Sequence, residues 1–202
     1  MTFGLWIVAS YLLGSIPTSY LVGRLGAGID LRQHGSKNLG ATNVYRVLGW
    51  RYAVPVGLVD VAKGTVPVAV FGPLAGTEPW MPMVLGLTAV LGHAFSVFVK
   101  FRGGKGVATA AGAVLALAPA ALGVSAAVWL ATLALSGYVS VASILGAAVF
   151  PVAVRLTDPT DRYALGVGIA LALFIVLTHQ SNIRRLAAGT ENRFGRRGQE
   201  VS

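Results

Sequence analysis

The stretch Phe101-Arg102-Gly103-Gly104-Lys105-Gly106, called the glycine loop below, stands between two long apolar segments. Because apolar segments of about 20 residues span a bilayer, a charged stretch between two of them is expected at a membrane surface. The residues that follow, 107–117, are predicted to form a helix, so the glycines precede a helix N-terminus. Backbone N–H groups exposed at such an end, together with a lysine, favour anion binding. The stretch therefore predicts a turn between helices and an anion site.

The overall composition is that of a chain residing in a membrane. Of 202 residues, 55% are hydrophobic and 11% charged, with a mean hydropathy of +0.71, whereas about a quarter of the residues of soluble domains are charged. Long apolar runs between short charged loops indicate an all-α polytopic membrane protein, and alternating strands typical of a barrel are missing from the sequence. We assign the net charge of +9 to the loops and an anion site rather than to nucleic-acid binding.

The residue types that are missing exclude several chemistries. The chain has no cysteine, which excludes disulfides, thiolate metal ligands and a cysteine nucleophile. The N-terminal apolar stretch lacks a preceding basic region and has the length of a full span. It is therefore predicted to be the first transmembrane helix rather than a cleaved signal.

Seven transmembrane helices are predicted. Their approximate bounds are 3–22, 52–71, 80–99, two helices within 106–135 that meet near Pro119, 138–154 and 163–177. The first of these helices is expected to kink in its second half, which carries Gly14, Ser15 and Pro17. No period of 20 to 50 residues, roughly, repeats along the chain.

The distribution of basic residues predicts the orientation. Thirteen of the sixteen Lys and Arg residues fall in the first loop, the glycine loop and the C-terminal tail. By the positive-inside rule all three are cytoplasmic, which puts the N-terminus outside and the C-terminus inside. An even number of crossings must then separate the glycine loop from the tail, and this is why residues 106–135 are divided into two helices. The bases concerned are Arg24, Arg32, Lys37, Arg46, Arg51, Lys100, Arg102, Lys105, Arg184, Arg185, Arg193, Arg196 and Arg197.

The first of three polar stretches on the predicted cytoplasmic side is His34-Gly35-Ser36-Lys37-Asn38-Leu39-Gly40-Ala41-Thr42-Asn43-Val44-Tyr45-Arg46. A helix starting near Leu39 would put Asn43 and Arg46 on one face. Arginine contacts phosphate through two N–H groups, and hydroxyls and amides add neutral hydrogen bonds. Substrate binding is therefore assigned to Ser36, Asn38, Thr42, Asn43 and Arg46. The alternative is a solvated loop whose charges only set the topology.

The second polar stretch begins at Gly92-His93 and includes the glycine loop. Anion binding is assigned to the loop residues Arg102, Gly103, Gly104, Lys105 and Gly106, because a simple turn needs fewer glycines. The alternative is such a turn, with a lysine that only sets the topology. No Ser or Thr follows the lysine and no strand precedes the glycines, so this is not a Walker A loop. His93 is assigned to substrate binding, because it lies inside a predicted span, where an ionisable residue indicates function; the alternative is a neutral histidine bonded to a neighbouring helix.

The third polar stretch is Thr178-His179-Gln180-Ser181-Asn182-Ile183-Arg184-Arg185-Leu186, followed by Gly189-Thr190-Glu191-Asn192. His179 and Asn182 share a face if the helix continues. With Glu191, both are assigned to substrate binding, whereas the arginines alone would be membrane anchors.

A pair of opposite charges lies inside the second predicted span. Asp60 and Lys63 are one helical turn apart and are predicted to neutralise each other while facing the bundle. They could orient the first loop, but we do not assign them to catalysis. The sequence contains no His-x4-Asp, no Gly-x-Ser-x-Gly elbow and no pair of intramembrane acids typical of a metal site. No general base of the usual kind and no metal or other cofactor is therefore predicted.

The three polar stretches resemble those of the acyl-phosphate:glycerol-3-phosphate acyltransferases, bacterial integral-membrane enzymes. The resemblance covers nearly the whole chain and includes Gly14-Ser15-Ile16-Pro17, Gly35 to Asn43, Gly92-His93-Ala94-Phe95, Phe101 to Thr109, His179 to Arg185 and Gly189-Thr190-Glu191. Departures are small: Lys37 stands where a glycine is expected, and Gln180-Ser181 where charged residues are commoner.

The resemblance implies one integral-membrane acyltransferase domain over residues 1–202, with seven helices and a cytoplasmic site, in the bacterial cytoplasmic (inner) membrane. It implies acyl transfer from acyl phosphate to the 1-hydroxyl of glycerol 3-phosphate, giving lysophosphatidic acid and phosphate. An upstream enzyme would supply the acyl phosphate; acyl-CoA and acyl carrier protein would not be direct donors. Family binding residues carry over to Ser36, Arg46, Lys105, His179 and Asn182, and catalytic roles are assigned to Ser36, Lys105 and His179.

Two other classes of function compete with this hypothesis. A transporter or anion channel would account for the basic loops and the intramembrane Asp60 and Lys63. However, alternating access favours a site at the membrane midplane, whereas the polar stretches here gather on one side. A structural scaffold would leave the three polar stretches unexplained. No particular oligomeric state is predicted.

Overall fold

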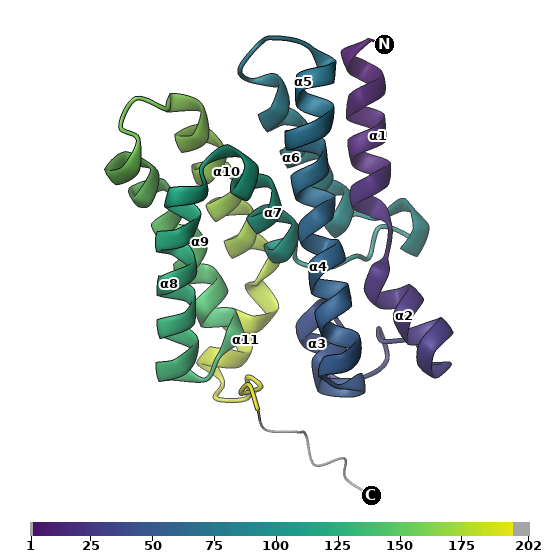
Figure 1. The fold of residues 1–202 in the computed structure, drawn as a ribbon. Helices are drawn as coiled ribbons and strands as arrows, with labels where there is room; N and C mark the ends of the chain where they lie inside the picture. Colours follow the sequence, from purple (N-terminus) through teal and green to yellow (C-terminus); the bar gives the residue numbers. More distant parts are fainter. Residues whose placement is uncertain (1, 196–202) are drawn as a thin grey trace, which may run out of the picture.

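The computed structural model describes residues 2–195 and, within them, every regular element is helical (Figure 1). The tail residues Arg196 and Arg197 lie outside the described residues. The elements are α1 (Phe3–Ser15), α2 (Thr18–Ala27), α3 (Ala41–Leu48), α4 (Trp50–Val66), the π-helical turn η1 (Pro67–Phe71), α5 (Gly72–Ala75), α6 (Met81–Ala94), the 3-10 turn η2 (Val97–Val99), α7 (Val107–Leu117), α8 (Pro119–Ser136), α9 (Val139–Thr157), α10 (Arg162–Thr178) and α11 (Gln180–Ala187).

Five helical stretches of the described chain are long and apolar enough to cross a membrane. They are Phe3–Ala27, Trp50–Ala75, Met81–Val99, Pro119–Ser136 and Val139–Thr157. The pair α10 and α11, bent by 56°, would make a sixth, and α7 is a shorter apolar helix. The prediction of a helical protein with several membrane spans is confirmed. With 11 residues, α7 is shorter than the ~20 residues that span a bilayer.

Two predicted interruptions of the helices are confirmed. Helix α7 ends at Leu117 and α8 begins at Pro119, whose missing N–H suits the first position of a helix. The first apolar segment breaks between Ser15 and Thr18, because Pro17 cannot donate the hydrogen bond that would continue α1. The third predicted span is α-helical only as far as Ala94, after which the 3-10 turn η2 leads into the glycine loop.

Helix α4 packs tightly against α7. A Cβ at Gly64 would overlap the carbonyl oxygen of Thr109, and one at Gly112 would overlap that of Val61. Small residues that let backbones approach this closely are typical of membrane helix pairs. On the other side of the molecule α8 packs along α9, and α9 packs along α10 (Figure 1).

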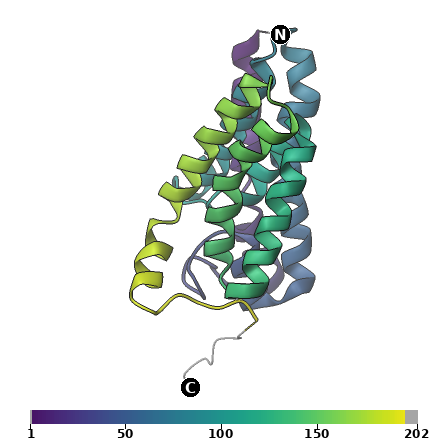
Figure 2. The same cartoon turned by 90° about the vertical axis from the view of Figure 1, so that its left-hand side faces the viewer.

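The chain after α11 returns beneath the other helices (Figure 2). The backbone N–H of Phe194 donates to the carbonyl of Gly137, between α8 and α9, at 2.7 Å. The Phe194 ring stacks on that of Tyr45 of α3, with centroids 5.0 Å apart. This segment joins both halves of the bundle at the end where α3 and α11 lie.

Candidate active site

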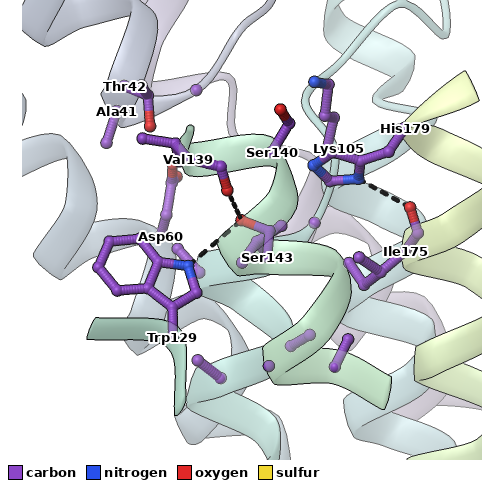
Figure 3. Close-up of a pocket in the computed structure, with 18 of the residues that line it drawn as sticks. Ala41, Thr42, Asp60, Lys105, Trp129, Val139, Ser140, Ser143, Ile175 and His179 are labelled. Atoms are coloured by element: carbon purple, nitrogen blue, oxygen red, sulfur yellow. Dashed lines mark hydrogen bonds between the residues drawn. The ribbon is translucent and has the colours of Figure 1, made fainter. Parts of the chain in front are cut away.

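A cavity of about 520 Å³ lies between α3, α7, α8, α9, α10 and α11 (Figure 3). It brings together side chains from all three polar stretches, which are far apart in the sequence. Its polar lining includes Ser36, Asn38, Thr42, Asn43, Arg46, Asp60, His93, Lys105, Ser140, His179, Asn182 and Glu191. The three stretches, which the sequence places on one side of the membrane, therefore meet in one cavity.

Lys105 is the central cation of the polar end. Its Nζ donates to Oδ1 of Asn182. Burial lowers the pKa of Lys105 to about 8, with Arg185 and Arg46 contributing in the same direction and Glu191 opposing them. Burial also lowers the pKa of the Arg46 guanidinium. Several cations thus face one another here, which makes this end suited to a phosphate dianion.

Glu191 holds the polar groups around Lys105 in place. Its Oε1 accepts from Nδ2 of Asn182 at 2.6 Å and from Oγ of Ser140 at 3.0 Å, and Oε2 accepts from Nε of Arg185 at 2.7 Å. Burial alone would raise the pKa of Glu191, but the hydrogen bonds from Asn182, Arg185 and Ser140 outweigh it and lower the pKa. The carboxylate is thus charged and already bonded to protein donors, which is the geometry of an organising residue.

His179 directs one ring nitrogen at the protein and leaves the other available. Nδ1 lies 2.7 Å from the carbonyl oxygen of Ile175 (Figure 3). A carbonyl oxygen can only accept, so Nδ1 carries the proton and Nε2 is the unprotonated nitrogen of the neutral ring. His179 lines the cavity and is 3% exposed. This tautomer can accept a proton from a group in the cavity.

Asn43 has its amide fully engaged by the loop before α3. Its Oδ1 accepts from the backbone N–H of Ser36 at 2.8 Å, and its Nδ2 donates to the carbonyls of Leu31 and His34 at 3.2 and 3.1 Å. Asn43 also lines the cavity, and its amide fastens Ser36 to α3, so its assignment to substrate binding stays a prediction. The other residues assigned in this stretch, Ser36, Asn38, Thr42 and Arg46, line the cavity.

Only the last two residues of the glycine loop, Lys105 and Gly106, line the cavity, whereas Arg102, Gly103 and Gly104 lie outside the lining. The reason is that Gly103 N donates to the carbonyl of Ala94 at 3.0 Å and Gly104 N to that of His93 at 3.1 Å. A Cβ at either glycine would overlap the end of α6, so packing explains these two glycines. The cavity is lined instead by Lys105, Gly106 and the first residues of α7, Val107 and Ala108.

The predicted pairing of Asp60 with Lys63 is present. Nζ lies 2.7 Å from Oδ1, and both side chains are 2% exposed. Nδ1 of His93 is 3.8 Å from the same oxygen. Asp60 and His93 both line the cavity.

Ser140, Ser143 and Trp129 are lining residues that the sequence did not single out. Nε1 of Trp129 donates to Oγ of Ser143 at 3.3 Å, and that hydroxyl donates to the carbonyl of Val139 at 2.8 Å (Figure 3). Two serines three residues apart at the start of an apolar helix are a weak signal, because serine is common in membrane helices.

Beyond the polar end the cavity continues as an apolar arm between α7, α8, α9 and α10. Its residues include Val114, Leu122, Ala126, Leu130, Gly146, Ala147, Phe150, Gly168, Leu171 and Ile175. The arm reaches Phe150, ten residues or about 15 Å along α9 from Ser140. One cavity thus combines a cationic end with a hydrocarbon-lined extension. In residues 2–195 there is no group of three or more His, Cys, Asp or Glu side chains that could hold a metal ion.

Comparisons with known proteins agree on one family. The chain matches the family described as Glycerol-3-phosphate acyltransferase over residues 4–189. It is 41% identical over 230 residues to the glycerol-3-phosphate acyltransferase of Chlorobaculum parvum, covering 98% of this chain and 99% of the relative. It is 49% identical over 187 residues to that of Desulforudis audaxviator, covering 92% of each.

Two crystal structures are similar to the structure of this chain. Both are of PlsY, described as an integral membrane glycerol 3-phosphate acyltransferase. Its glycerol 3-phosphate form gives a TM-score of 0.89 at 39% identity, over 96% of both chains. Its lysophosphatidic acid form gives a TM-score of 0.87 at 38% identity, over 96% of this chain and 95% of the other chain.

Proposed function

Because the chain belongs to the glycerol-3-phosphate acyltransferase family of integral-membrane enzymes, we propose that its acyl donor is an acyl phosphate and its product lysophosphatidic acid. The observation that carries the proposal is the single cavity with a cationic end and an apolar arm. The cationic end suits the phosphates of both substrates, and the arm suits the hydrocarbon chain of the donor. An acyl phosphate is a mixed anhydride, so the reaction needs little help from a strong base.

The polar residues divide between the two phosphates. Arg46, Lys105 and Asn182 hold the phosphate of glycerol 3-phosphate. The phosphoryl group of the donor lies at the N-terminus of α7, where backbone N–H groups and the helix dipole favour an anion. Ser36 positions the reacting groups. Support comes from the convergence of these residues on one cavity.

The reaction is a direct transfer. The 1-hydroxyl oxygen of glycerol 3-phosphate attacks the acyl carbonyl carbon, an ester bond forms, and the bond from that carbon to the phosphate oxygen breaks. The hydroxyl proton goes to the departing phosphate, so that catalysis comes mostly from proximity and from stabilisation of negative charge. The rival acceptor is Nε2 of His179.

The proposal extends to topology and location. Residues 1–202 act as one integral-membrane domain of seven helices, N-terminus outside, with the site open to the cytoplasm at the bacterial inner membrane. An upstream enzyme supplies the acyl phosphate. The convergence of the three basic, polar stretches on one cavity supports this arrangement.

The decisive experiment measures the acyl donor. Purified chain in lipid vesicles is given labelled glycerol 3-phosphate with acyl phosphate, acyl-CoA or acyl carrier protein loaded with the same chain. Labelled lysophosphatidic acid is expected with acyl phosphate alone. Formation with acyl-CoA or the carrier protein at an equal rate would contradict the proposed donor. Counterflow of labelled glycerol 3-phosphate without lipid formation would instead indicate a transporter.

A further inference from the structure

Asp60, Lys63 and His93 form a buried polar cluster that the proposed reaction does not use. Lys63 Nζ lies 2.7 Å from Asp60 Oδ1, and His93 Nδ1 lies 3.8 Å from the same oxygen, with no side chain more than 9% exposed. Ionisable groups inside membrane-spanning helices are costly and mark functional positions. Two charges that only neutralised each other could be replaced by apolar residues at little cost in stability.

The cluster ties three helices together beside the glycine loop. The carboxylate and the ammonium lie on α4, and the imidazole lies on the last turn of α6. Nζ of Lys63 also donates to the carbonyl oxygen of Ile16, in the break between α1 and α2. One residue earlier, Oγ of Ser15 donates to the carbonyl of Gly92 at 3.2 Å. The end of α6 that carries His93 is thus held by both α1 and α4.

The glycine loop is packed directly on His93. The backbone N–H of Gly104 donates to the carbonyl of His93 at 3.1 Å. A Cβ at Gly104 would overlap Nε2 of His93 on one side and the carbonyl oxygen of Leu39 on the other. The imidazole therefore forms the surface beneath Gly104, and a displaced ring would move the next residue, Lys105.

We propose that His93 is a positioning residue: the Asp60–Lys63 ion pair holds its imidazole beneath Gly104, which keeps Lys105 and the start of α7 directed into the cavity. The inference rests on the proposed function, because it takes Lys105 as a ligand of glycerol 3-phosphate. His93 acts on the loop and not on the reacting atoms, so its loss weakens binding equally in the ground state and the transition state. Such a loss raises KM and leaves kcat nearly unchanged.

The first test is steady-state kinetics of the full chain at saturating acyl phosphate, with glycerol 3-phosphate varied. His93→Ala is expected to raise KM for glycerol 3-phosphate about tenfold or more and to change kcat by less than about threefold. His93→Gln, whose amide fills part of the ring's space, is expected to recover part of the loss. Leu85→Ala is the matched control, because it empties a fully buried site on the same helix away from the loop. An unchanged KM in His93→Ala, or a fall in kcat at constant KM, overturns the proposal.

The second test measures the link to the ion pair. Asp60→Asn combined with Lys63→Met removes both charges, so no unpaired charge remains buried. This double variant alone is expected to raise KM several-fold, which keeps the test available if His93→Ala does not fold. Adding His93→Ala to it should raise KM no further than His93→Ala does by itself. Effects that multiply would show that the groups act independently and would contradict the proposal.

Failure of the proposed function has a different signature. If the unsubstituted chain forms no lysophosphatidic acid from acyl phosphate, the proposed donor is wrong whatever the variants do. The affinity for glycerol 3-phosphate, measured by titration calorimetry, then still reports on His93→Ala. An affinity equal to that of the unsubstituted chain would overturn the inference.

Discussion

Lys105 owes its properties to its surroundings and not to its place in the sequence. Burial removes water from the ammonium group and lowers its pKa to about 8, while the hydrogen bond to Asn182 fixes its position. A lysine in this state is charged at neutral pH but close to losing its proton. Its proposed contribution to phosphate binding should therefore depend on pH in a range that can be measured.

Lys105→Ala tests the size of that contribution. The substitution removes the central cation of the proposed anion site. We expect a loss of about 2.7 kcal/mol or more in kcat/KM, a size comparable to the loss of one oxyanion donor. This corresponds to a fall of roughly 100-fold or more in kcat/KM. The measurement is the initial rate of lysophosphatidic acid formation, and activity near that of the unsubstituted chain would rule out the anion site.

The pH profile of kcat/KM should fall as the pH rises through about 8. The pKa of Lys105 is lowered from 10.5 to about 8 in the folded protein, so the cation is present below that pH and is lost above it. The pH dependence of kcat/KM reports the pKa values of the free enzyme. The fall should therefore follow the titration of Lys105 in the enzyme without bound substrate. Lys105→Arg is the control, since arginine remains protonated and should remove the alkaline limb even if its overall rate is lower.

His179→Gln separates the two proton acceptors. If the departing phosphate accepts the proton, the variant should keep kcat within about tenfold, because a positioned general base contributes about 100-fold to 10,000-fold. Glutamine preserves a polar side chain in the cavity lining while removing the basic nitrogen. A fall in kcat within that larger range, at unchanged KM, would instead assign the proton to Nε2.

At the scale of the helices, the far end of the apolar arm is formed where α9 meets α10. Phe150 is 5% exposed, and a Cβ at Gly168 would lie 2.7 Å from its ring. Among the lining residues, Phe150 lies farthest along α9 from Ser140, and Gly168 lies farthest along α10 from His179. The two helices therefore set how deep the arm is.

Phe150→Ala should shift the donor preference toward longer acyl chains. Removing the ring deepens the arm, and one methylene in an apolar pocket is worth about tenfold or more in kcat/KM. We compare kcat/KM for a longer acyl phosphate with kcat/KM for a shorter one. In the variant this ratio is expected to rise about tenfold for each additional methylene that the deeper arm accommodates. Gly168→Ala, which pushes the ring into the arm, should shift the preference the other way. Leu85→Ala should leave the ratio unchanged, and equal ratios in all three variants would contradict this account.

The helices also show which elements local sequence can predict. The breaks at Pro17 and Pro119 follow from the missing N–H of proline, and both are present at the predicted places. The end of α6 at Ala94 was not predicted, because the apolar run continues to Val99. That end depends on long-range contacts, such as the hydrogen bond from the Tyr11 hydroxyl to the Phe95 carbonyl at 2.7 Å.

At the scale of the whole molecule, the proposed topology makes a direct prediction. The chain has no cysteine, so single cysteines can be introduced without a background signal. In intact cells an impermeant maleimide is expected to label Glu78→Cys and Thr160→Cys, on the proposed outer side. It should label Lys100→Cys and Leu25→Cys only after the membrane is opened. All four positions are exposed, and the reverse pattern would invert the proposed orientation.

The amino-acid sequence by itself determined the membrane class, most of the helices and the three polar stretches. These properties reside in local composition: hydropathy sets the spans, proline sets the breaks, and clustered polar residues mark the site. The family could be recognised for the same reason, since its motifs are short and contiguous. The convergence of Arg46, Lys105 and Asn182 was expected from the resemblance and is present.

Only the tertiary structure decided what each side chain in those stretches contacts. Gly103 and Gly104 face the end of α6, Asn43 is bonded to its own loop, and Glu191 is bonded to protein donors. Ser140 and the apolar arm join the site from helices that look ordinary in the sequence. The physical reason is that hydrogen bonds and close packing depend on which backbones lie side by side, and that arrangement joins residues tens of positions apart. The glycine loop is predicted by its sequence, but which of its N–H groups face the cavity depends on where α6 ends.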